Sequence, residues 1–241
     1  MDGIEAWSGL ELIERIEEGN RNEVWRGHIG EQRVAVRRSR RRADSLAWEL
    51  DLLHELAAAD FVVPYVVPTD TGATSHHGVV VQRWIDGHAP ATTEDWNAVA
   101  NELQRLHRVL RDHPQRPGCV AVTELERTTS SVDADMAALP DAVASRALGI
   151  FHALREAPHG VIHGDPGASN LRILADGRVG LLDFDESRRD VLWHDLSELG
   201  VQVLTDDDHQ RARRLSNAWE AVNAWIAEPD YARERLAQLD A

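Results

Sequence analysis

The sequence contains no lysine, so all 26 basic residues among its 241 are arginines. Any mechanism that requires a lysine side chain is therefore excluded. Cysteine is nearly absent as well. Cys119 is the single one, which excludes an internal disulfide and a cysteine-rich metal site and favours a reducing, cytoplasmic compartment. The first residues lack the basic and apolar regions of a signal peptide, and Pro64 and Pro68 interrupt the most apolar early run, so we expect no membrane partner.

Negative charge outweighs positive charge, and the formal net charge is −15. Because phosphates and anionic lipids are bound through basic surfaces, this balance argues against nucleic acid or a membrane as the main partner. Hydrophobic residues make up 43% and charged residues 28% of the chain, close to the usual composition of globular proteins. The chain is long enough for one large domain or two modest lobes, and its composition leaves the oligomeric state open.

Strand patterns dominate the first part of the chain. Residues 22–29 and 32–38 alternate around a turn at Gly30 and predict a hairpin, and two further strands are expected within residues 62–70 and 77–84. Between the two pairs, leucines at helical spacing predict a helix over residues 45–59, with Asp44 or Ser45 as its N-cap.

Helix patterns dominate the rest. We expect helices over residues 93–110, 133–157, 208–227 and 231–239. The chain therefore divides near Gly87 into a small sheet-rich lobe with one helix, residues 1–86, and a larger helical lobe, residues 87–241. This combination predicts an α+β fold.

One segment of the helical part, VIHGDPGASNLRILADGRVGLLDFDES at residues 161–187, has strand-like runs instead. Asp-Gly at residues 176–177 is a strong signal for a hairpin with a two-residue turn. A turn centred there makes Asn170 and Asp183 cross-strand neighbours, with Cβ atoms about 4.5–5.5 Å apart. An amide oxygen and a carboxylate at that separation can share one divalent cation.

These polar residues are of the kind that a magnesium-nucleotide site requires. Mg²⁺ prefers oxygen ligands, and a further carboxylate can orient an incoming hydroxyl and accept its proton during phosphoryl transfer. Asp165, in the loop that enters the hairpin, suits that second role. For any one of these residues alone, a turn cap or a solvated loop is the simpler explanation, and only their joint spacing favours a site.

The segment resembles a motif pair of the aminoglycoside phosphotransferase family, H-G-D-x-x-x-x-N followed by D-F/W-D/E/G. Further stretches are similar to this family, namely WELDLLHELA, VPYVVP, WIDG, LQRLHRVL and WHDLSELG. The resemblance implies a protein-kinase-like fold of two lobes. It also implies transfer of phosphate from ATP, or GTP as an alternative, to a hydroxyl of a small molecule, with Mg²⁺.

The resemblance also implies roles for individual residues. His163 and Asp165 would form the catalytic loop, with His163 in a supporting role, and Asn170, Asp183 and Asp185 would hold the metal, although Asp185 could equally face solvent. The nucleotide would be bound in the first lobe by Gly19, Ala35, Arg37, Glu49, Arg83 and Trp84.

One position departs from the family pattern. Arg37 lies where kinase-like enzymes carry a lysine that holds the α- and β-phosphates, and it would pair with Glu49. Strand alternation places Arg37 on the same face as Ala35, which would lie against the base. Arginine can bind phosphate bidentately and keeps its charge, so the function can survive this exchange.

Two residues outside the motif pair are expected to be structural. His107 lies on an otherwise apolar helical face, which is typical of a hydrogen-bonded core histidine, and Asp195 is expected to brace the catalytic loop through hydrogen bonds.

Two alternatives remain open at the level of sequence. GLLDFD also resembles the nucleophile motif of haloacid-dehalogenase-like phosphatases, with Asp183 as the nucleophile, although too few residues follow it to complete a doubly wound sheet. A kinase-like protein that binds nucleotide without catalysis is the second. Several acidic residues close in sequence to the proposed metal site would line the approach of a substrate and favour a cationic acceptor, such as an aminoglycoside or an amino alcohol. They are Asp185, Glu186, Asp190, Glu198 and the run of Asp206 to Asp208.

Overall fold

The computed structural model describes residues 1–16, 23–131 and 133–239. The chain divides into two compact units. Unit 1 contains Met1–Ala89 and Ser169–Leu182, and unit 2 contains Pro90–Ala168 and Asp183–Ala241. The hairpin segment, which the sequence analysis assigned to the helical lobe, is thus grouped mainly with the first unit. Within the described residues, no helix is both long and apolar enough to cross a membrane.

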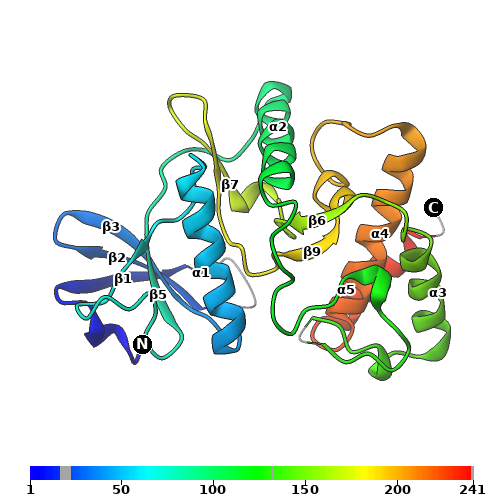
Figure 1. The fold of residues 1–241 in the computed structure, drawn as a ribbon, viewed down its shortest axis with the longest axis horizontal. Coiled ribbons are helices and arrows are strands. Elements are labelled where there is room, and N and C mark those ends of the chain that lie inside the picture. The colour runs from blue at the N-terminus through cyan, green and yellow to red at the C-terminus, as the bar shows by residue number, and fades with distance from the viewer. Residues whose placement is uncertain (17–22, 132, 240–241) are drawn as a thin grey trace. The chain divides into compact units, whose positions relative to one another are not determined.

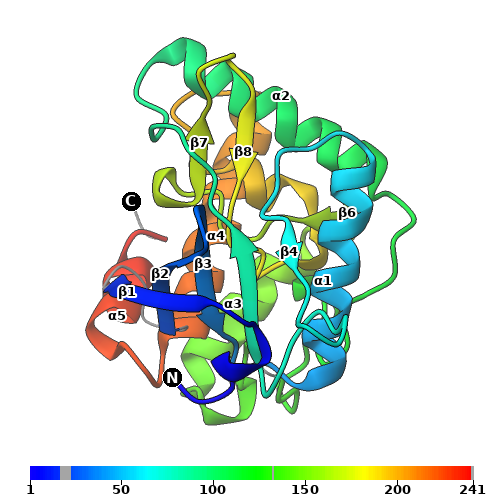
Figure 2. The same ribbon diagram turned by 90° about the vertical axis from the view of Figure 1, so that its left-hand side faces the viewer.

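Unit 1 is built on a five-stranded antiparallel sheet (Figures 1 and 2). Its strands follow the order β1-β2-β3-β5-β4 across the sheet. The strand bounds are β1 Leu10–Ile16, β2 Glu23–Ile29, β3 Gln32–Arg38, β4 Val66–Val67 and β5 Val79–Arg83. A short 3-10 helix, η1 at Ile4–Ala6, precedes the first strand.

The predicted hairpin of β2 and β3 is confirmed. Ile29 pairs with Gln32 across a two-residue turn in which Gly30 has a φ of 58°, a conformation that glycine adopts without strain. Along β3, Val34 and Val36 point into an apolar cluster with Trp7, Val79 and Val81. Ala35 and Arg37 therefore share the opposite face, as alternation predicts.

Helix α1, Ala43–Ala58, packs beside this sheet within unit 1 (Figure 1). The predicted apolar stripe is confirmed, because the four leucines that define it, Leu46, Leu50, Leu53 and Leu56, are all buried. The predicted N-cap is wrong. The cap position is Arg42, without a side-chain cap hydrogen bond, and Asp44 lies in the first turn, where its negative charge stabilises the positive end of the helix dipole.

The second hairpin of unit 1 consists of β7, Leu171–Ile173, and β8, Val179–Leu181. Its predicted register is wrong by one residue. Arg172 pairs with Gly180, and the Leu182 amide donates to the Asn170 carbonyl at 2.8 Å, so Asn170 faces Leu182 and not Asp183. A two-residue type I′ turn needs a positive φ at both central residues, whereas here only Gly177 has one, at 83°.

The hairpin is connected to other parts of unit 1 by backbone bridges. His88 pairs with Ile173, and Val62 pairs with Gly180. A side chain at Gly87 would collide with the Ile173 carbonyl, because a Cβ built there lies 2.6 Å from that oxygen. These close approaches explain why the segment is grouped with the first unit.

Unit 2 is mainly helical. Its helices are α2 Thr93–Val109, α3 Asp141–His152, α4 Asp206–Ala224 and α5 Pro229–Ala237, with 3-10 helices η2 Val122–Glu124, η3 Met136–Ala138 and η5 Leu192–Leu196. A further 3-10 turn, η4 at Ala168–Asn170, leads into β7. All four predicted helices exist, but the one expected over 133–157 is shorter. The apolar core of unit 2 includes Met136, Phe151, Leu215 and Trp219.

A two-stranded sheet in unit 2 was not predicted. Strands β6, His159–Ile162, and β9, Arg188–Val191, pair antiparallel (Figure 1). In the sequence, β6 precedes and β9 follows the segment that contains the predicted site residues. Each strand has four residues, too few for alternation to be distinguished from a loop.

Candidate active site

The proposed catalytic loop, which contains His163 and Asp165, is held by one buried carboxylate of unit 2. Asp195, on η5, is fully buried and accepts hydrogen bonds from the backbone amides of His163 at 2.8 Å and Gly164 at 2.9 Å. His107, buried on α2, lies with its Nε2 2.8 Å from Asp195 Oδ2. Both residues therefore have the structural positions expected from the sequence.

The electrostatics of Asp195 follow from these contacts. Burial on its own raises the pKa of this carboxyl group, but the hydrogen bond from His107, the charges of His107 and His163 and the Gly164 amide lower it. The net result is a pKa of about 2, below the ordinary 3.8. Asp195 is therefore an anion over the whole physiological range and fixes the loop as a permanent acceptor.

Asp165 directly follows the anchored residues His163 and Gly164 and is exposed. Its amide donates to His163 Nδ1 at 3.4 Å, so the buried imidazole contacts the backbone of the proposed base. The ring of His163 also lies 4.7 Å from that of Phe184. Tight backbone anchoring with an exposed carboxylate is the arrangement that a positioned proton acceptor needs.

The proposed metal loop, residues 183–187, packs directly on the catalytic loop. A Cβ built on Gly164 would lie 2.5 Å from the Glu186 carbonyl oxygen, so only a glycine fits at that contact, and its φ of 95° also favours glycine. Phe184 contacts His163 from the same loop. The structure thus brings the segments of Asp165 and Asp183 together within unit 2.

Asp183 itself has a left-handed backbone, with a φ of 54°. Its Oδ1 accepts a hydrogen bond from the Asp185 amide at 3.3 Å, which tightens the turn. Asp183 is exposed and Asp185 is 6% exposed, so one carboxylate of the pair faces outward and the other inward. Carboxylate and amide oxygens suit Mg²⁺, so the donor chemistry of Asp183, Asp185 and Asn170 fits this ion.

Asn170 belongs to unit 1 and is half-buried. Because of the one-residue difference in register, the predicted cross-strand pair with Asp183 does not exist. Among residues 1–16, 23–131 and 133–239, no group of three or more His, Cys, Asp and Glu side chains is arranged to hold a metal ion.

In unit 1, the predicted pairing of Arg37 with Glu49 is present. The Arg37 Nη2 atom forms an ion pair with Glu49 Oε1 between β3 and α1. Arg37 is 5% and Glu49 1% exposed, so the charges are shielded from solvent. Their role in binding phosphate remains a prediction.

The other nucleotide-binding candidates occupy the same sheet. Ala35 is half-buried on β3. The Arg83 guanidinium lies 4.6 Å from the centre of the Tyr65 ring, and the half-buried Trp84 ring lies 4.9 Å from the Arg26 guanidinium. The side chains of Arg83 and Trp84 thus make contacts with other residues in this structure. Gly19 lies outside the described residues.

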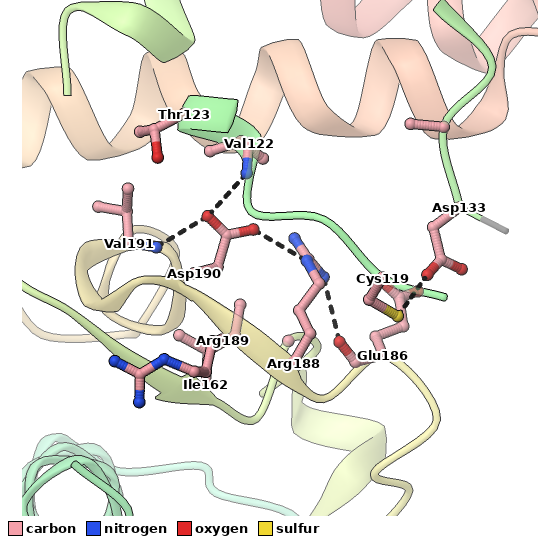
Figure 3. Close-up of polar contacts among 12 residues, drawn as sticks. Cys119, Val122, Thr123, Asp133, Ile162, Glu186, Arg188, Arg189, Asp190 and Val191 are labelled. Atoms are coloured by element: carbon pink, nitrogen blue, oxygen red, sulfur yellow. Dashed lines mark hydrogen bonds and ion pairs between the residues drawn. The ribbon is translucent and has the colours of Figure 1, made fainter. Parts of the chain in front are cut away.

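Several acids that the sequence analysis assigned to a substrate cleft have structural partners instead. Figure 3 shows Asp190 accepting from the Arg188 side chain at 2.9 Å and from the amides of Val122 and Val191. Both members of this ion pair are 1% exposed. Asp190 is therefore inaccessible to a substrate. Its strand, β9, has only four residues, too few for an alternating pattern in the sequence to indicate that Asp190 is buried.

Glu198 and the run of Asp206 to Asp208 lie near or within helices α4 and α5. Glu198 pairs with Arg235 at 3.0 Å, and the run of Asp206 to Asp208 forms the first turn of α4, capped by Thr205. Negative charge at a helix N-terminus is stabilising without any ligand. A hollow of about 600 Å³ near these helices is lined mainly by polar residues, including the cationic Arg213 and Arg214. The negative charge therefore does not form a uniform acidic cleft.

The phosphatase alternative does not fit the sheets. All strand pairs of the described sheets are antiparallel, and the haloacid-dehalogenase-like reading requires a doubly wound parallel sheet around Asp183.

Comparison with known proteins gives consistent results. A family model described as the phosphotransferase enzyme family matches residues 12–237. The chain is similar in structure to choline kinase LicA from Streptococcus pneumoniae, with 15% identity and a TM-score of 0.65 over 95% of this chain and 92% of that one. A microcompartment-associated aminopropanol kinase aligns with 18% identity and a TM-score of 0.64 over 96% and 89%. The GDP and kanamycin complex of APH(2″)-IIia aligns with 15% identity and a TM-score of 0.60 over 97% and 92%.

No curated protein sequence matches the chain significantly. The family match nevertheless spans nearly the whole chain, and the solved structures share its fold over most of their own length. With one unit built on an antiparallel sheet and one mainly helical, the chain has the protein-kinase-like fold and belongs to the phosphotransferase enzyme family.

Proposed function

We propose that the protein transfers the γ-phosphoryl group of ATP to a hydroxyl group of a small cationic alcohol, with magnesium. The observation that carries this proposal is the anchored loop of unit 2, in which Asp195 fixes two backbone amides while Asp165 remains exposed beside the Asp183 loop. GTP is the alternative donor.

Each unit has a separate task in this proposal. Unit 1 binds the nucleotide, and Arg37, oriented by Glu49, contacts its phosphates in place of the usual lysine. Unit 2 provides the catalytic loop and binds the acceptor. Asn170, Asp183 and Asp185 would hold magnesium, which supplies positive charge to the transferring phosphoryl group.

In the chemical step, the acceptor oxygen forms a bond to the γ-phosphorus and the bond from that phosphorus to the β–γ bridging oxygen breaks, which releases ADP. The Asp165 carboxylate orients the hydroxyl and accepts its proton. His163 and Asp195 do not touch the reacting atoms and act by fixing the backbone of the loop.

The acceptor class follows from the similar kinases and from the exposed carboxylates of unit 2. Choline and aminopropanol, which two of the similar kinases are named for, are both small cationic alcohols. The exposed carboxylates of Asp165 and Asp183 can contribute negative potential near such a cation. An aminoglycoside is the alternative acceptor.

The reaction is tested by measuring ADP release with ATP and magnesium for aminopropanol, ethanolamine, choline and kanamycin, with propanediol as a neutral acceptor. We expect turnover with at least one cationic alcohol and little with propanediol. Preference for propanediol at both low and high salt would contradict the cationic acceptor.

The role of Asp165 is tested with Asp165→Asn, and Asp230→Asn on α5 is a matched control, since both residues are exposed aspartates of unit 2. Losing a general base should lower kcat by about 10²- to 10⁴-fold in the first variant and leave it unchanged in the second. Calorimetry should show unchanged binding of Mg-ATP in both variants. Full activity of Asp165→Asn would exclude it as the base.

A further inference from the structure

The loop that follows α2, residues 113–118, places an arginine beneath the proposed metal loop. Arg116 is 1% exposed, and its Nη1 atom donates hydrogen bonds to three backbone carbonyls of that loop. The acceptors are Phe184 at 3.0 Å, Asp185 at 2.8 Å and Ser187 at 3.2 Å. The buried side chain of Arg116 thus binds backbone carbonyls along most of the proposed metal loop.

The neighbouring residue fixes the position of the arginine and the far end of the loop. Gln115 Oε1 accepts from the Arg189 amide at 2.9 Å, and its Nε2 donates to the Arg189 carbonyl at 2.9 Å. The same Oε1 accepts from the Arg116 amide at 2.8 Å. The Gln115 side chain therefore pairs with β9 as a neighbouring strand would, and it holds Arg116 at a defined distance from the metal loop.

The chemistry of this contact suits a positioning role. Loop carbonyls turned inward need buried donors, and hydrogen bonds from a charged donor are roughly twice as strong as neutral ones. Arginine stays charged under all conditions and presents its donors in a rigid plane, so it fixes direction as well as distance. Asp185, one of the proposed magnesium ligands, has its own carbonyl among the three acceptors.

We propose that Arg116 is a positioning residue of the phosphotransfer reaction, which sets the conformation of the loop that carries Asp183 and Asp185. The inference rests on the proposed function, since it assigns a purpose to that loop. Arg116 acts only through the backbone of residues 184–187 and does not contact the reacting groups. Residues that hold metal ligands in this way typically change metal affinity or activity by about 10- to 100-fold when replaced.

A purely structural role makes a different prediction. In that case, replacing Arg116 would lower stability without affecting the magnesium requirement of the remaining folded enzyme. Arg127 offers a matched control, because it also donates to backbone carbonyls within unit 2, those of Met136 and Leu139, away from the metal loop.

The experiment compares Arg116→Lys, Arg116→Met and Arg127→Met with the wild-type protein. Hydrogen–deuterium exchange of metal-free protein should show faster exchange of the amides of residues 183–188 in both Arg116 variants. Exchange there should be unchanged in Arg127→Met. Arg116→Lys retains a charged donor, so it should fold even if Arg116→Met does not, and it should show the smaller change.

In the transfer assay, the magnesium concentration for half-maximal rate should rise by about 10- to 100-fold in Arg116→Met and by less in Arg116→Lys, with the KM of the acceptor unchanged. Calorimetry of magnesium with a non-hydrolysable ATP analogue should show the same shift without turnover. If exchange of residues 183–188 or magnesium affinity stays at the wild-type value in both Arg116 variants, the inference is wrong. Absence of turnover in the wild-type protein would contradict the proposed function alone, because exchange and calorimetry need no transfer.

Discussion

The buried ion pair of unit 1 joins two side chains, whereas the buried charges at the loops of unit 2 bind the backbone. Arg37 and Glu49 connect a strand to a helix. Asp195 accepts two amides, and Arg116 donates to three carbonyls. Side chains can be exchanged together by mutation, but backbone groups cannot. Loss of charge should therefore be repairable at the Arg37–Glu49 pair of unit 1 and irreparable at Asp195 and Arg116 of unit 2.

The largest effect on stability is expected from Asp195→Ala. The change leaves two buried amides and His107 without their acceptor, and removing one partner of a buried charged pair typically costs about 3–5 kcal/mol. Urea unfolding should show this loss, and transfer activity should disappear with it.

Adding His107→Leu to Asp195→Ala is the corresponding attempt at repair. It removes the imidazole but leaves both amides unsatisfied, so most of the lost stability should not return. Recovery to near the wild-type value would break the contrast between the two units.

A smaller effect, of about 3 kcal/mol, is expected for Arg37→Met, because Glu49 would lose its buried ion-pair partner. The double change Arg37→Met with Glu49→Leu should recover most of this stability, since apolar residues of similar volume often replace a buried ion pair without cost. Activity should not recover, because the arginine proposed to contact the phosphates would be missing. A double variant that is as unstable as Arg37→Met would show that this pair behaves like the backbone anchors of unit 2.

The smallest of the three effects is the loss of folding stability at low pH. The pKa of Asp195 lies at about 2 in the folded protein against an ordinary 3.8, so its ionised form adds about 2 kcal/mol of stability at neutral pH. A lowered folded-state pKa gives stability that is present above about pH 4 and is lost as the pH falls towards 2.

The measurement is the difference in unfolding free energy between the wild-type protein and Asp195→Asn as a function of pH. This difference should be constant from neutral pH to about pH 4 and shrink below it. A difference that stays constant down to pH 2 would contradict the lowered pKa.

Local patterns predicted most of the elements. The leucine spacing of α1 and the β2–β3 hairpin follow from short stretches of sequence, whereas the bracing by Asp195 was expected from the family resemblance. Hairpin register was harder, because Asp-Gly is compatible with more than one loop length. The actual loop has three residues, with Leu174 N donating to the Arg178 carbonyl and Gly177 alone in the left-handed region.

Contacts between distant segments were not predictable. Arg116 binds carbonyls about seventy positions along the chain, and backbone acceptors carry no side-chain signature in the sequence. Asp190 was misread for a related reason, since its partner Arg188 is only two residues away but the burial of both depends on unit 2 as a whole. A charged residue in a sequence does not reveal whether it faces water or backbone.

The left-handed backbone of Asp183 has a consequence for mutational scanning. Glycine, asparagine and aspartate tolerate this conformation best, whereas alanine adds strain of about 1 kcal/mol or more. A saturation library read for abundance should therefore accept Gly and Asn at residue 183, while the same library read for the proposed phosphate transfer should accept only Asp. The difference between the two readouts would distinguish the substitutions that the backbone conformation at residue 183 permits from those that the proposed reaction permits.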